Sequence, residues 1–397
     1  MVTVSVGVYA LLLARSDPAR PAATATLGTP PSTFSPLFTP TPLPTAGLGL
    51  SSATPDPTLT PTRVPVLPVP SAEPRRLYWG AWLSGPPEAS AFAPGGLVPQ
   101  FEAEVDKSLA LLHWGQAWRR EGKYQSFPVA NFDNIRNHGA IPVLDWGPWV
   151  AGAGPDQPDF RLSAVVSGVH DAYVLEWANA AKTWGHPFFL RFGWEMNGDW
   201  KYPWSEQLNA NRPGDYVAAW RHVHDLFVQA GATNVTWVWC PNVTDPTTTP
   251  LAGLYPGEAY VDWVCLSGYN FYESWISFDS LFTGRGLSWL GPSYGDVLSL
   301  APTKPVLVVT GSVEGGDGGA KKAAWITDLL SVQLPRQFTQ VAGVVWFNWD
   351  GEDSRYATLP LESSAAALAA FAAAIQSDFY ASAEFAHLSA SPLAPLK

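Results

Sequence analysis

Short apolar runs alternate with longer amphipathic stretches along the chain from residue 76 onward. Runs rich in β-branched and aromatic residues predict buried strands, and apolar positions repeated every three or four residues predict helices. Eight strands alternating with helices predict a (β/α)8 TIM barrel. A doubly wound open sheet is the alternative, but no G-x-G-x-x-G follows the first strand, so a dinucleotide site has no support. The predicted strands span 76–83, 109–114, 140–146, 188–192, 234–240, 260–269, 304–309 and 341–347, and the clearest helices span 171–185, 214–231, 320–334 and 363–379.

The amino-terminal part of the chain has a different pattern and is not expected to belong to the barrel. The apolar run at residues 2–14 is shorter than the about 20 residues of a membrane span, so residues 1–17 are interpreted as a secretory signal or a membrane anchor. Residues 18–74 contain 15 Pro and 11 Thr, and proline interrupts both helix and sheet, which predicts a disordered linker or stalk. This organisation predicts an exported protein, extracellular or held at the cell surface. Residues 76–381 are the predicted barrel domain, and residues 382–397 are a predicted flexible tail.

Composition narrows the class of function. The formal net charge is −11 and charged residues make up 14% of the chain, which argues against a nucleic-acid binder and against adsorption to anionic lipid. Two cysteines, Cys240 and Cys265, are too few for a disulfide scaffold or a Cys-built metal site, and they form either one disulfide or two buried thiols. We expect no metal, no other cofactor and a monomer. All 20 Trp lie between Trp79 and Trp349, and so many flat rings favour a cleft that stacks on sugar rings.

The strongest local signal is the segment FFLRFGWEMNGDWKYPW, residues 188–204, at the fourth predicted strand. In a barrel, catalytic side chains lie where a strand ends and the next loop begins. Glu195 lies there among tryptophans, and desolvation favours the protonated carboxyl that can donate a proton to a leaving group. Arg191 is placed to orient a carboxylate or to bind sugar hydroxyls, and the amide of Asn197 can both donate and accept hydrogen bonds.

The segment RFGWEMNGDWKYPW resembles the acid/base motif of glycoside hydrolase family 26, typified by β-mannanases. The likeness covers roughly residues 78–350 and includes YWGAWLSG at the first strand, YVDWVCLSGYNFY at the sixth and VAGVVWFNW at the eighth. It implies a (β/α)8 fold and the hydrolysis, with retention, of a β-linked polysaccharide such as β-mannan. It also implies that Glu195 is the proton donor and later the general base. The residues that it places along the substrate cleft are Trp194, Asn197, Trp200, Tyr269 and Trp346.

The chain departs from this family at the seventh predicted strand. A retaining mechanism needs a second carboxylate about 5–5.5 Å from the first, and the family carries it as a Glu at the end of that strand. Here the stretch reads KPVLVVTGS, and the position falls on Thr310 when counted from Pro305 and on Val309 when counted back from Gly311. Neither side chain is a carboxylate, so the departure puts catalytic activity in question.

Three alternatives follow from this departure. Glu314, in the glycine-rich loop SVEGGDGG, is a candidate substitute nucleophile. A second alternative is a catalytically impaired barrel that binds glycan without turning it over. In the third, a carboxylate at another strand end acts as the base of an inverting reaction, which tolerates a separation of about 6.5–9.5 Å. The candidates for that base are Asp145, Asp245, Glu273 and Asp350.

Two further groups of polar residues are interpreted as structural. Asp171, beside His170, opens a predicted helix, where the helix dipole favours a negative charge. The acidic residues of the segment 350–353 lack the spacing of a known calcium loop and are interpreted as solvated loop charge.

Overall fold

The computed structural model describes residues 75–200, 202–271, 275–349 and 357–397. Its strands are β1 (Tyr78–Leu83), β2 (Leu111–Arg120), β3 (Lys123–Tyr124), β4 (Ile141–Val150), β5 (Phe188–Phe192), β6 (Val235–Trp239), β7 (Trp263–Asn270), β8 (Val306–Ser312) and β9 (Val341–Asn348). All except β3 are parallel and follow one another around the sheet in the order β1, β9, β8, β7, β6, β5, β4, β2, and β1 also pairs with β2. This closure confirms the predicted TIM barrel and excludes the open sheet.

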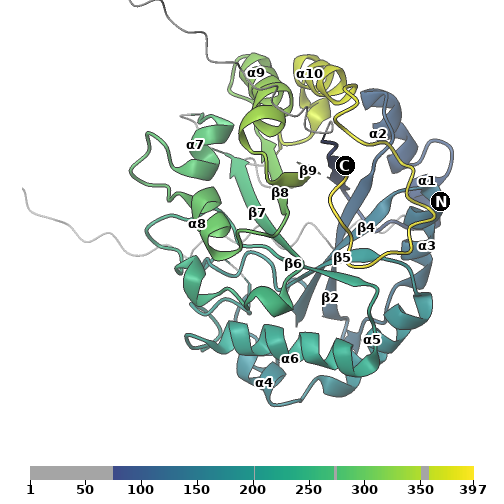
Figure 1. Ribbon diagram of the computed structural model, residues 1–397, viewed down its shortest axis with the longest axis vertical. Coiled ribbons are helices and arrows are strands. Elements are labelled where there is room, and N and C mark those ends of the chain that lie inside the picture. Colours follow the sequence, from purple (N-terminus) through teal and green to yellow (C-terminus); the bar gives the residue numbers. More distant parts are fainter. Residues whose placement is uncertain (1–74, 201, 272–274, 350–356) are drawn as a thin grey trace, which may run out of the picture. The chain divides into compact units, whose positions relative to one another are not determined.

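Helices follow the strands and form the outer layer of the barrel (Figure 1). The long helices end at glycines in the left-handed conformation, as at Gly185 (φ 75°) and Gly231 (φ 73°), in agreement with the terminal glycines of the predicted helices. The α-helices are α1 (Ala89–Phe92), α2 (Leu97–Val105), α3 (Val129–His138), α4 (Leu162–Val166), α5 (Asp171–Trp184), α6 (Asp215–Ala230), α7 (Phe278–Thr283), α8 (Ser293–Leu300), α9 (Ala320–Asp328) and α10 (Ala365–Ile375). The other helical segments are η2 (Pro158–Phe160), η3 (Leu251–Gly253), η4 (Glu258–Tyr260), the π-helix η5 (Leu329–Gln337) and η6 (Leu361–Ser363).

Two strands extend well beyond their predicted ends. β2 continues to Arg120 instead of ending at Trp114, and β4 continues to Val150 instead of Trp146. The prediction ended early because polar residues such as Gln116 interrupt the apolar run, although the parallel ladder continues past them. The short strand β3 folds back antiparallel on β2. The longer β2 and β4 therefore extend one side of the barrel at its carboxyl end, where the candidate catalytic residues are predicted.

Most tryptophans pack between the barrel and its helices. The ring of Trp146 on β4 lies 4.7 Å from that of Trp177 on α5 and 4.9 Å from that of Trp118 on β2, measured between centroids. All three are at most 1% exposed. The tryptophan content thus reflects packing first, and only the few rings near Glu195 fit the predicted sugar-stacking cleft.

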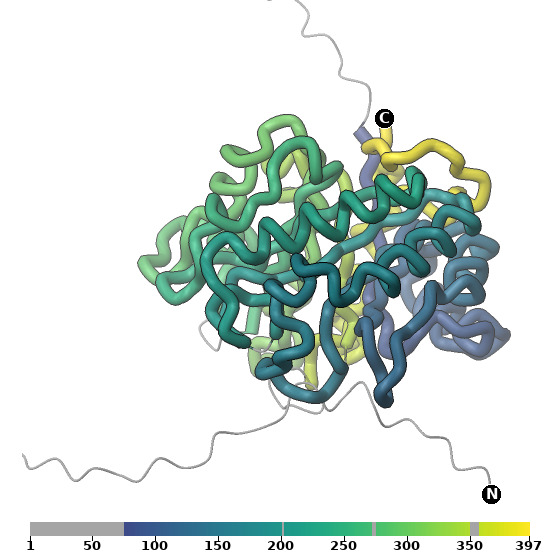
Figure 2. Tube along the Cα trace, turned by 90° about the horizontal axis from the view of Figure 1, so that it is seen from below, coloured from purple at the N-terminus to yellow at the C-terminus, as the bar shows by residue number. Residues whose placement is uncertain are grey.

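The carboxyl-terminal segment 382–397, predicted as a flexible tail, packs against the barrel. The Trp263 indole donates a hydrogen bond to the Leu393 carbonyl at 2.7 Å, and the Leu393 N–H donates to the Thr236 hydroxyl at 2.8 Å. Both partners lie near the amino ends of their strands. Figure 2 shows the segment, in yellow, at one end of the barrel, with the blue loops around residues 115–160 at the other. The small residues of this segment show no helix or strand periodicity, because the segment packs on the barrel as irregular backbone.

Ending the chain after residue 389 should therefore lower the free energy of unfolding by about 2–5 kcal/mol, because the apolar contacts of Leu393 are lost and the Trp263 indole and Thr236 hydroxyl lose their partners. Urea denaturation followed by tryptophan fluorescence measures this. A chain that lacks only Lys397 is the control. Equal stability of the two shortened chains would contradict the prediction.

The predicted segments 1–17 and 18–74 lie outside the described residues. Within the residues that the structure does describe, none of the helices combines the length and the apolar character needed to cross a membrane.

Candidate active site

Glu195 lies in the turn that follows β5. Gly193 (φ 52°) and Glu195 (φ 51°) both adopt the left-handed conformation, which is uncommon for a residue with a side chain. The Glu195 N–H donates a hydrogen bond to the Cys240 carbonyl at 2.7 Å, which ties this turn to the end of β6. Glu195 is 9% exposed. A carboxylate held in a strained turn at the carboxyl end of a barrel strand is placed as a catalytic group would be.

Aromatic rings stand on one side of the Glu195 turn. The Trp194 indole donates to the Tyr202 hydroxyl at 3.0 Å, and the Trp204 indole donates to the Trp194 carbonyl at 2.8 Å. Trp149, at the end of β4, contacts these three rings edge-on with centroids 5.5–6.3 Å apart. We call Trp149, Trp194, Tyr202 and Trp204 the aromatic wall. Gly147 makes room for it, because a Cβ at that position would lie 2.6 Å from the Trp204 ring.

Below this turn, three polar side chains meet inside the barrel. Asp145 Oδ1 lies 2.7 Å from Arg191 Nη1 and 2.9 Å from His113 Nε2. The three residues come from the neighbouring strands β4, β5 and β2, and each is at most 4% exposed. Arg191 Nη2 also donates to the Ser267 hydroxyl at 3.1 Å. Arg191 therefore orients a carboxylate, as one of its two predicted roles requires, but its head group is directed to Asp145 and not to a sugar site.

Two tyrosines flank Glu195. Burial raises the pKa of Tyr202 and of Tyr269 well above the usual range, and the negative charge of Glu195 is the next largest cause at both. The charge of Asp145 also raises both pKa values, and that of Arg191 lowers them. Because these influences weaken with distance, the charges and the two tyrosines form one cluster. Both hydroxyls stay protonated and can donate hydrogen bonds.

The His113 imidazole gives the site a pH-dependent contribution to stability. Burial lowers the pKa of His113; the charge of Asp145 raises it and that of Arg191 lowers it. An unfolded chain protonates this imidazole near pH 6.5, whereas the folded chain excludes the proton until a lower pH. The unfolded state therefore binds more protons below about pH 6.5, and the free energy of unfolding should fall by up to about 2 kcal/mol between pH 7 and pH 5. Urea titrations across this range should give a shallower pH dependence for His113→Gln, and identical slopes would refute the assignment.

Cys240 and Cys265 form a disulfide, with Cα atoms 4.3 Å apart. The sequence had left a disulfide and two thiols open. Cys240 directly follows β6, Cys265 lies in β7, and both are fully buried. Arg191 Nη2 lies 3.0 Å from Cys240 Sγ. The disulfide is thus in the barrel interior beside the turn that carries Glu195.

β8 places no carboxylate in the barrel interior. Val309 pairs with Ser267, whose hydroxyl contacts Arg191 inside the barrel, whereas Thr310 pairs with Trp346, which packs outward on the helices. Successive residues of a strand face opposite sides. Val309 is therefore the inward-facing residue of the two that the sequence left open, and the Thr310 hydroxyl instead donates to the Gly268 carbonyl at 2.7 Å.

Glu314 is engaged in an ion pair near α9. The Ser363 hydroxyl donates to Glu314 Oε1 at 2.5 Å, and Lys322 Nζ lies 3.7 Å from the same oxygen. Lys322 is fully buried and also donates to three backbone carbonyls of residues 358–360. Burial lowers the pKa of Lys322 to about 8, and Glu314 opposes this shift. Moving Glu314 toward Glu195 would leave a buried lysine without its counter-charge, which disfavours Glu314 as a substitute nucleophile.

Two residues predicted to line the cleft make structural contacts. Asn197 is fully buried, and its amide donates to the Asn242 carbonyl at 2.9 Å and accepts from the Asn242 N–H at 2.8 Å. Trp346 is 1% exposed, and its ring lies 5.6 Å from that of Phe371 on α10. The burial and contacts of Asn197 and Trp346 thus favour structural roles over the ligand contacts predicted for them.

Trp200 and Tyr269 stay candidates for ligand contacts. Trp200 is 40% exposed, and its ring lies directly on the backbone of Gly198, where a Cβ would come within 1.9 Å. Tyr269, near the end of β7, is half-buried, and its ring stacks on Phe271 with centroids 5.2 Å apart. Both rings belong to the loops and strand ends around Glu195.

Sequence reasoning missed four residues of this site. His113 interrupts an apolar strand, and a polar residue inside such a strand is a signal that could have been followed. Tyr202 and Trp204 stand in the motif itself, at alternate positions, but were not assigned to the site. Trp149 lies beyond the predicted end of its strand, so no pattern pointed to it.

Asp245, another carboxylate predicted as a base, is engaged in its own turn. Asp245 accepts hydrogen bonds from Thr247 and Thr248 in its own turn. Glu273, Asp350 and the rest of the acidic segment 350–353 lie outside the described residues.

The interpretation of the His170–Asp171 pair as helix-associated fits the structure only in part. Asp171 lies in the first turn of α5 and pairs with His222 of α6 at 2.7 Å, whereas the His170 side chain makes no cap hydrogen bond.

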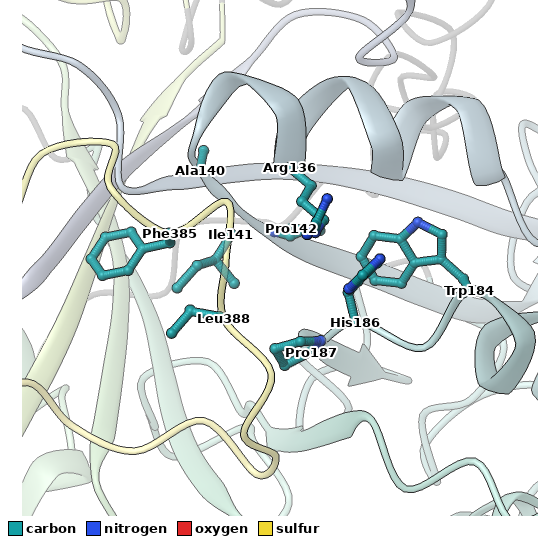
Figure 3. Close-up of a pocket in the computed structure, with 9 residues that line it drawn as sticks. All are labelled: Arg136, Ala140, Ile141, Pro142, Trp184, His186, Pro187, Phe385 and Leu388. Atoms are coloured by element: carbon teal, nitrogen blue, oxygen red, sulfur yellow. The ribbon is translucent and has the colours of Figure 1, made fainter.

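A small pocket lies at the amino ends of β4 and β5, away from Glu195 (Figure 3). Arg136, Trp184 and His186 line it together with Phe385 and Leu388 of the carboxyl-terminal segment. It is not part of the candidate active site, which lies at the carboxyl ends of the strands.

Comparisons with known proteins give a consistent result. The family model of glycosyl hydrolase family 26 matches residues 131–297. Endoglucanase H of Acetivibrio thermocellus is 30% identical over 309 residues, which is 75% of this chain and 30% of that protein. Mannan endo-1,4-beta-mannosidase A and B of Caldalkalibacillus mannanilyticus is 35% identical over 80 residues, which is 19% of this chain and 15% of that protein. The chain thus spans less than a third of the length of either relative.

Solved structures share the fold. A family 26 β-mannanase from Bacteroides ovatus has a TM-score of 0.54 at 16% identity, covering 78% of this chain and 91% of that one. The mannanase BCman of Bacillus subtilis has a TM-score of 0.52 at 15% identity, covering 78% and 87%. At these identities the likeness concerns the barrel alone.

Proposed function

Because the chain belongs to glycosyl hydrolase family 26, we propose that its barrel acts on a β-linked polysaccharide of the mannan or glucan type. The observation that carries this is Glu195, a carboxylate at the carboxyl end of β5 in a tied-down turn between the aromatic wall and Tyr269. Aromatic rings pack well against the apolar faces of sugar rings. The substrate class follows the names of the relatives, which are an endoglucanase and β-mannanases.

In this proposal Glu195 is the general acid and later the general base. It protonates the glycosidic oxygen as a second carboxylate displaces the leaving sugar from the anomeric carbon, and it then takes a proton from the water that displaces that carboxylate from the same carbon. β8 does not supply this second carboxylate. Trp194 and Trp200 supply flat surfaces for the sugar chain. The protonated hydroxyls of Tyr202 and Tyr269 are donors that can hold the Glu195 carboxylate or a sugar hydroxyl in place.

A second candidate function is glycan binding with little or no hydrolysis. It is favoured by Val309, an apolar residue that faces inward near the end of β8, the strand on which the family resemblance implies the second carboxylate. Glu314 does not fill that role while it is paired with Lys322. Under this function Trp194 and Trp200 still bind the glycan, and only turnover is lost.

We also propose that the protein acts outside the cytoplasm, as a monomer. The Cys240–Cys265 disulfide supports the location outside the cytoplasm, because such bonds persist in oxidising compartments. The proline-rich segment 18–74 would then hold the barrel away from a cell surface.

The test is the release of reducing sugar by the purified chain from mannan, xylan and mixed-linkage glucan, together with binding to each glycan by isothermal titration calorimetry. Glu195→Gln keeps the shape of the side chain but cannot donate a proton, so it should abolish release and leave binding largely intact. Trp200→Ala should weaken binding, since its ring is exposed beside the site.

The outcomes separate the two functions. Release by the native chain and none by Glu195→Gln supports a hydrolase. Binding without release in both supports the second candidate function. A chain that neither binds nor cleaves any of the three glycans would overturn both.

A further inference from the structure

The disulfide joins β6 and β7, two strands that pair over a short ladder. These strands share only the register pairs Val238↔Trp263 and Trp239↔Val264, whereas β7 and β8 share seven pairs from Val264↔Val306 onward. The next residues in register are Cys240 and Cys265. Pro241 follows, and a proline has no N–H to continue the ladder. Backbone pairing resumes just beyond, where the Ser267 N–H donates to the Pro241 carbonyl at 2.9 Å and the Val243 N–H donates to the Ser267 carbonyl at 2.8 Å. The covalent bond thus joins the two strands between two short stretches of backbone pairing.

Cys240 also makes two contacts with the candidate active site. Its carbonyl accepts the hydrogen bond of the Glu195 N–H at 2.7 Å, and its sulfur lies 3.0 Å from Arg191 Nη2. Two residues further on, Asn242 holds both ends of the Asn197 amide. The first residues of the loop after β6 therefore hold the Glu195 turn in place through hydrogen bonds.

We propose that the Cys240–Cys265 disulfide is a positioning element of the active site, which is complete only in the oxidised chain. The bond fixes Cys240, and Cys240 fixes the Glu195 backbone and borders the Arg191 head group. Its effect on turnover rests on the proposed function, whereas its effect on the Glu195 turn does not. Both cysteines act through other residues and touch no substrate.

The disulfide can be opened by reduction with a dithiol. The sulfur–sulfur bond breaks, two electrons and two protons pass from the dithiol to the cysteines, and the dithiol becomes a cyclic disulfide. Two buried thiols then replace the bond. Cys240 is then held only by the backbone pairs on either side of it and by its contacts with Glu195 and Arg191, so the Glu195 turn is held less firmly.

The experiment is hydrogen–deuterium exchange of the full chain, read by mass spectrometry on the peptide that contains the Glu195 amide. Cys265→Ser breaks the disulfide but leaves every contact of Cys240 with Glu195 and Arg191 in place. Val238→Ala is the matched control, because it thins the same strand two residues earlier and keeps the bond. Native protein kept reduced in dithiothreitol, without alkylation, serves if Cys265→Ser does not fold.

We expect the Glu195 amide to exchange about tenfold faster in Cys265→Ser than in the native chain, with peptides of β1 and β2 unchanged. Val238→Ala should exchange there as the native chain does. Equal exchange at Glu195 with and without the bond would overturn the proposal, and so would an equal increase in all strands, which marks a general loss of stability.

Turnover and affinity give a second reading. If the native chain hydrolyses glycan, Cys265→Ser should lower kcat more than it raises KM and shift the pH profile of kcat, because Glu195 is displaced while the sugar-binding rings stay. Unchanged kcat and pH profile would count against a positioning role. A native chain that neither binds nor cleaves glycan refutes the proposed function alone. The exchange measurement still decides whether the disulfide positions the Glu195 turn.

Discussion

Val309→Glu is expected to increase the release of reducing sugar by about a hundredfold or more, the order of effect that a single catalytic group supplies. Val309 faces the barrel interior from β8, on the same side as Ser267 and Arg191. A carboxylate there is the missing partner of Glu195 in a retaining reaction. Ser267, which pairs with Val309 and whose hydroxyl contacts Arg191, can offer it a hydrogen bond, which lowers the cost of burying it.

Matched variants make the Val309→Glu result specific. Val309→Gln has the same shape without the charge and should show no gain. Thr310→Glu places the carboxylate toward the helices, so it should destabilise the barrel without raising activity. Adding Glu195→Gln to Val309→Glu should remove the gain. Proton NMR of the released sugar should show the β-anomer first, and a first product with the α-anomer would contradict the retaining assignment.

Asp145→Asn is expected to lower the free energy of unfolding by about 3–5 kcal/mol, because it leaves the Arg191 guanidinium buried without a counter-charge. Ser267 and Cys240 accept hydrogen bonds from that head group but carry no compensating charge. Guanidinium chloride denaturation at pH 7 measures the loss.

A paired replacement is the control for Asp145→Asn. The double variant Asp145→Leu/Arg191→Met removes both charges and fills similar volume, so it should regain most of the lost stability. A double variant as unstable as the single one would mean that packing, and not the unpaired charge, is the cause.

The barrel could be predicted from the sequence because each strand and helix has its own local pattern of apolar residues. It could not predict which way a side chain faces when a strand is apolar on both sides. VAGVVWF is buried throughout, so Trp346 was assigned to the cleft although it packs on α10. The same ambiguity left Val309 and Thr310 undecided until pairing with β7 fixed the face of each.

The candidate site was predictable where one segment carries it, and not where distant segments meet. Glu195, Trp194 and Trp200 stand in a single motif. The ion cluster joins His113, Asp145 and Arg191 from three strands, and only the strand order brings them together. Asn197 shows the opposite case, since a polar residue in a catalytic motif serves the backbone of a neighbouring loop.

The way the amino end of the barrel is closed constrains the order of folding during synthesis. The Tyr78 hydroxyl donates to the Ala394 carbonyl at 3.0 Å, and Leu77 bridges to Tyr380, so the first strand is completed by residues made some 300 positions later. Until those residues leave the ribosome, the apolar ends of the early strands have no cover and are open to aggregation. The barrel therefore closes in one late step, and a stalled chain is a natural target for chaperones.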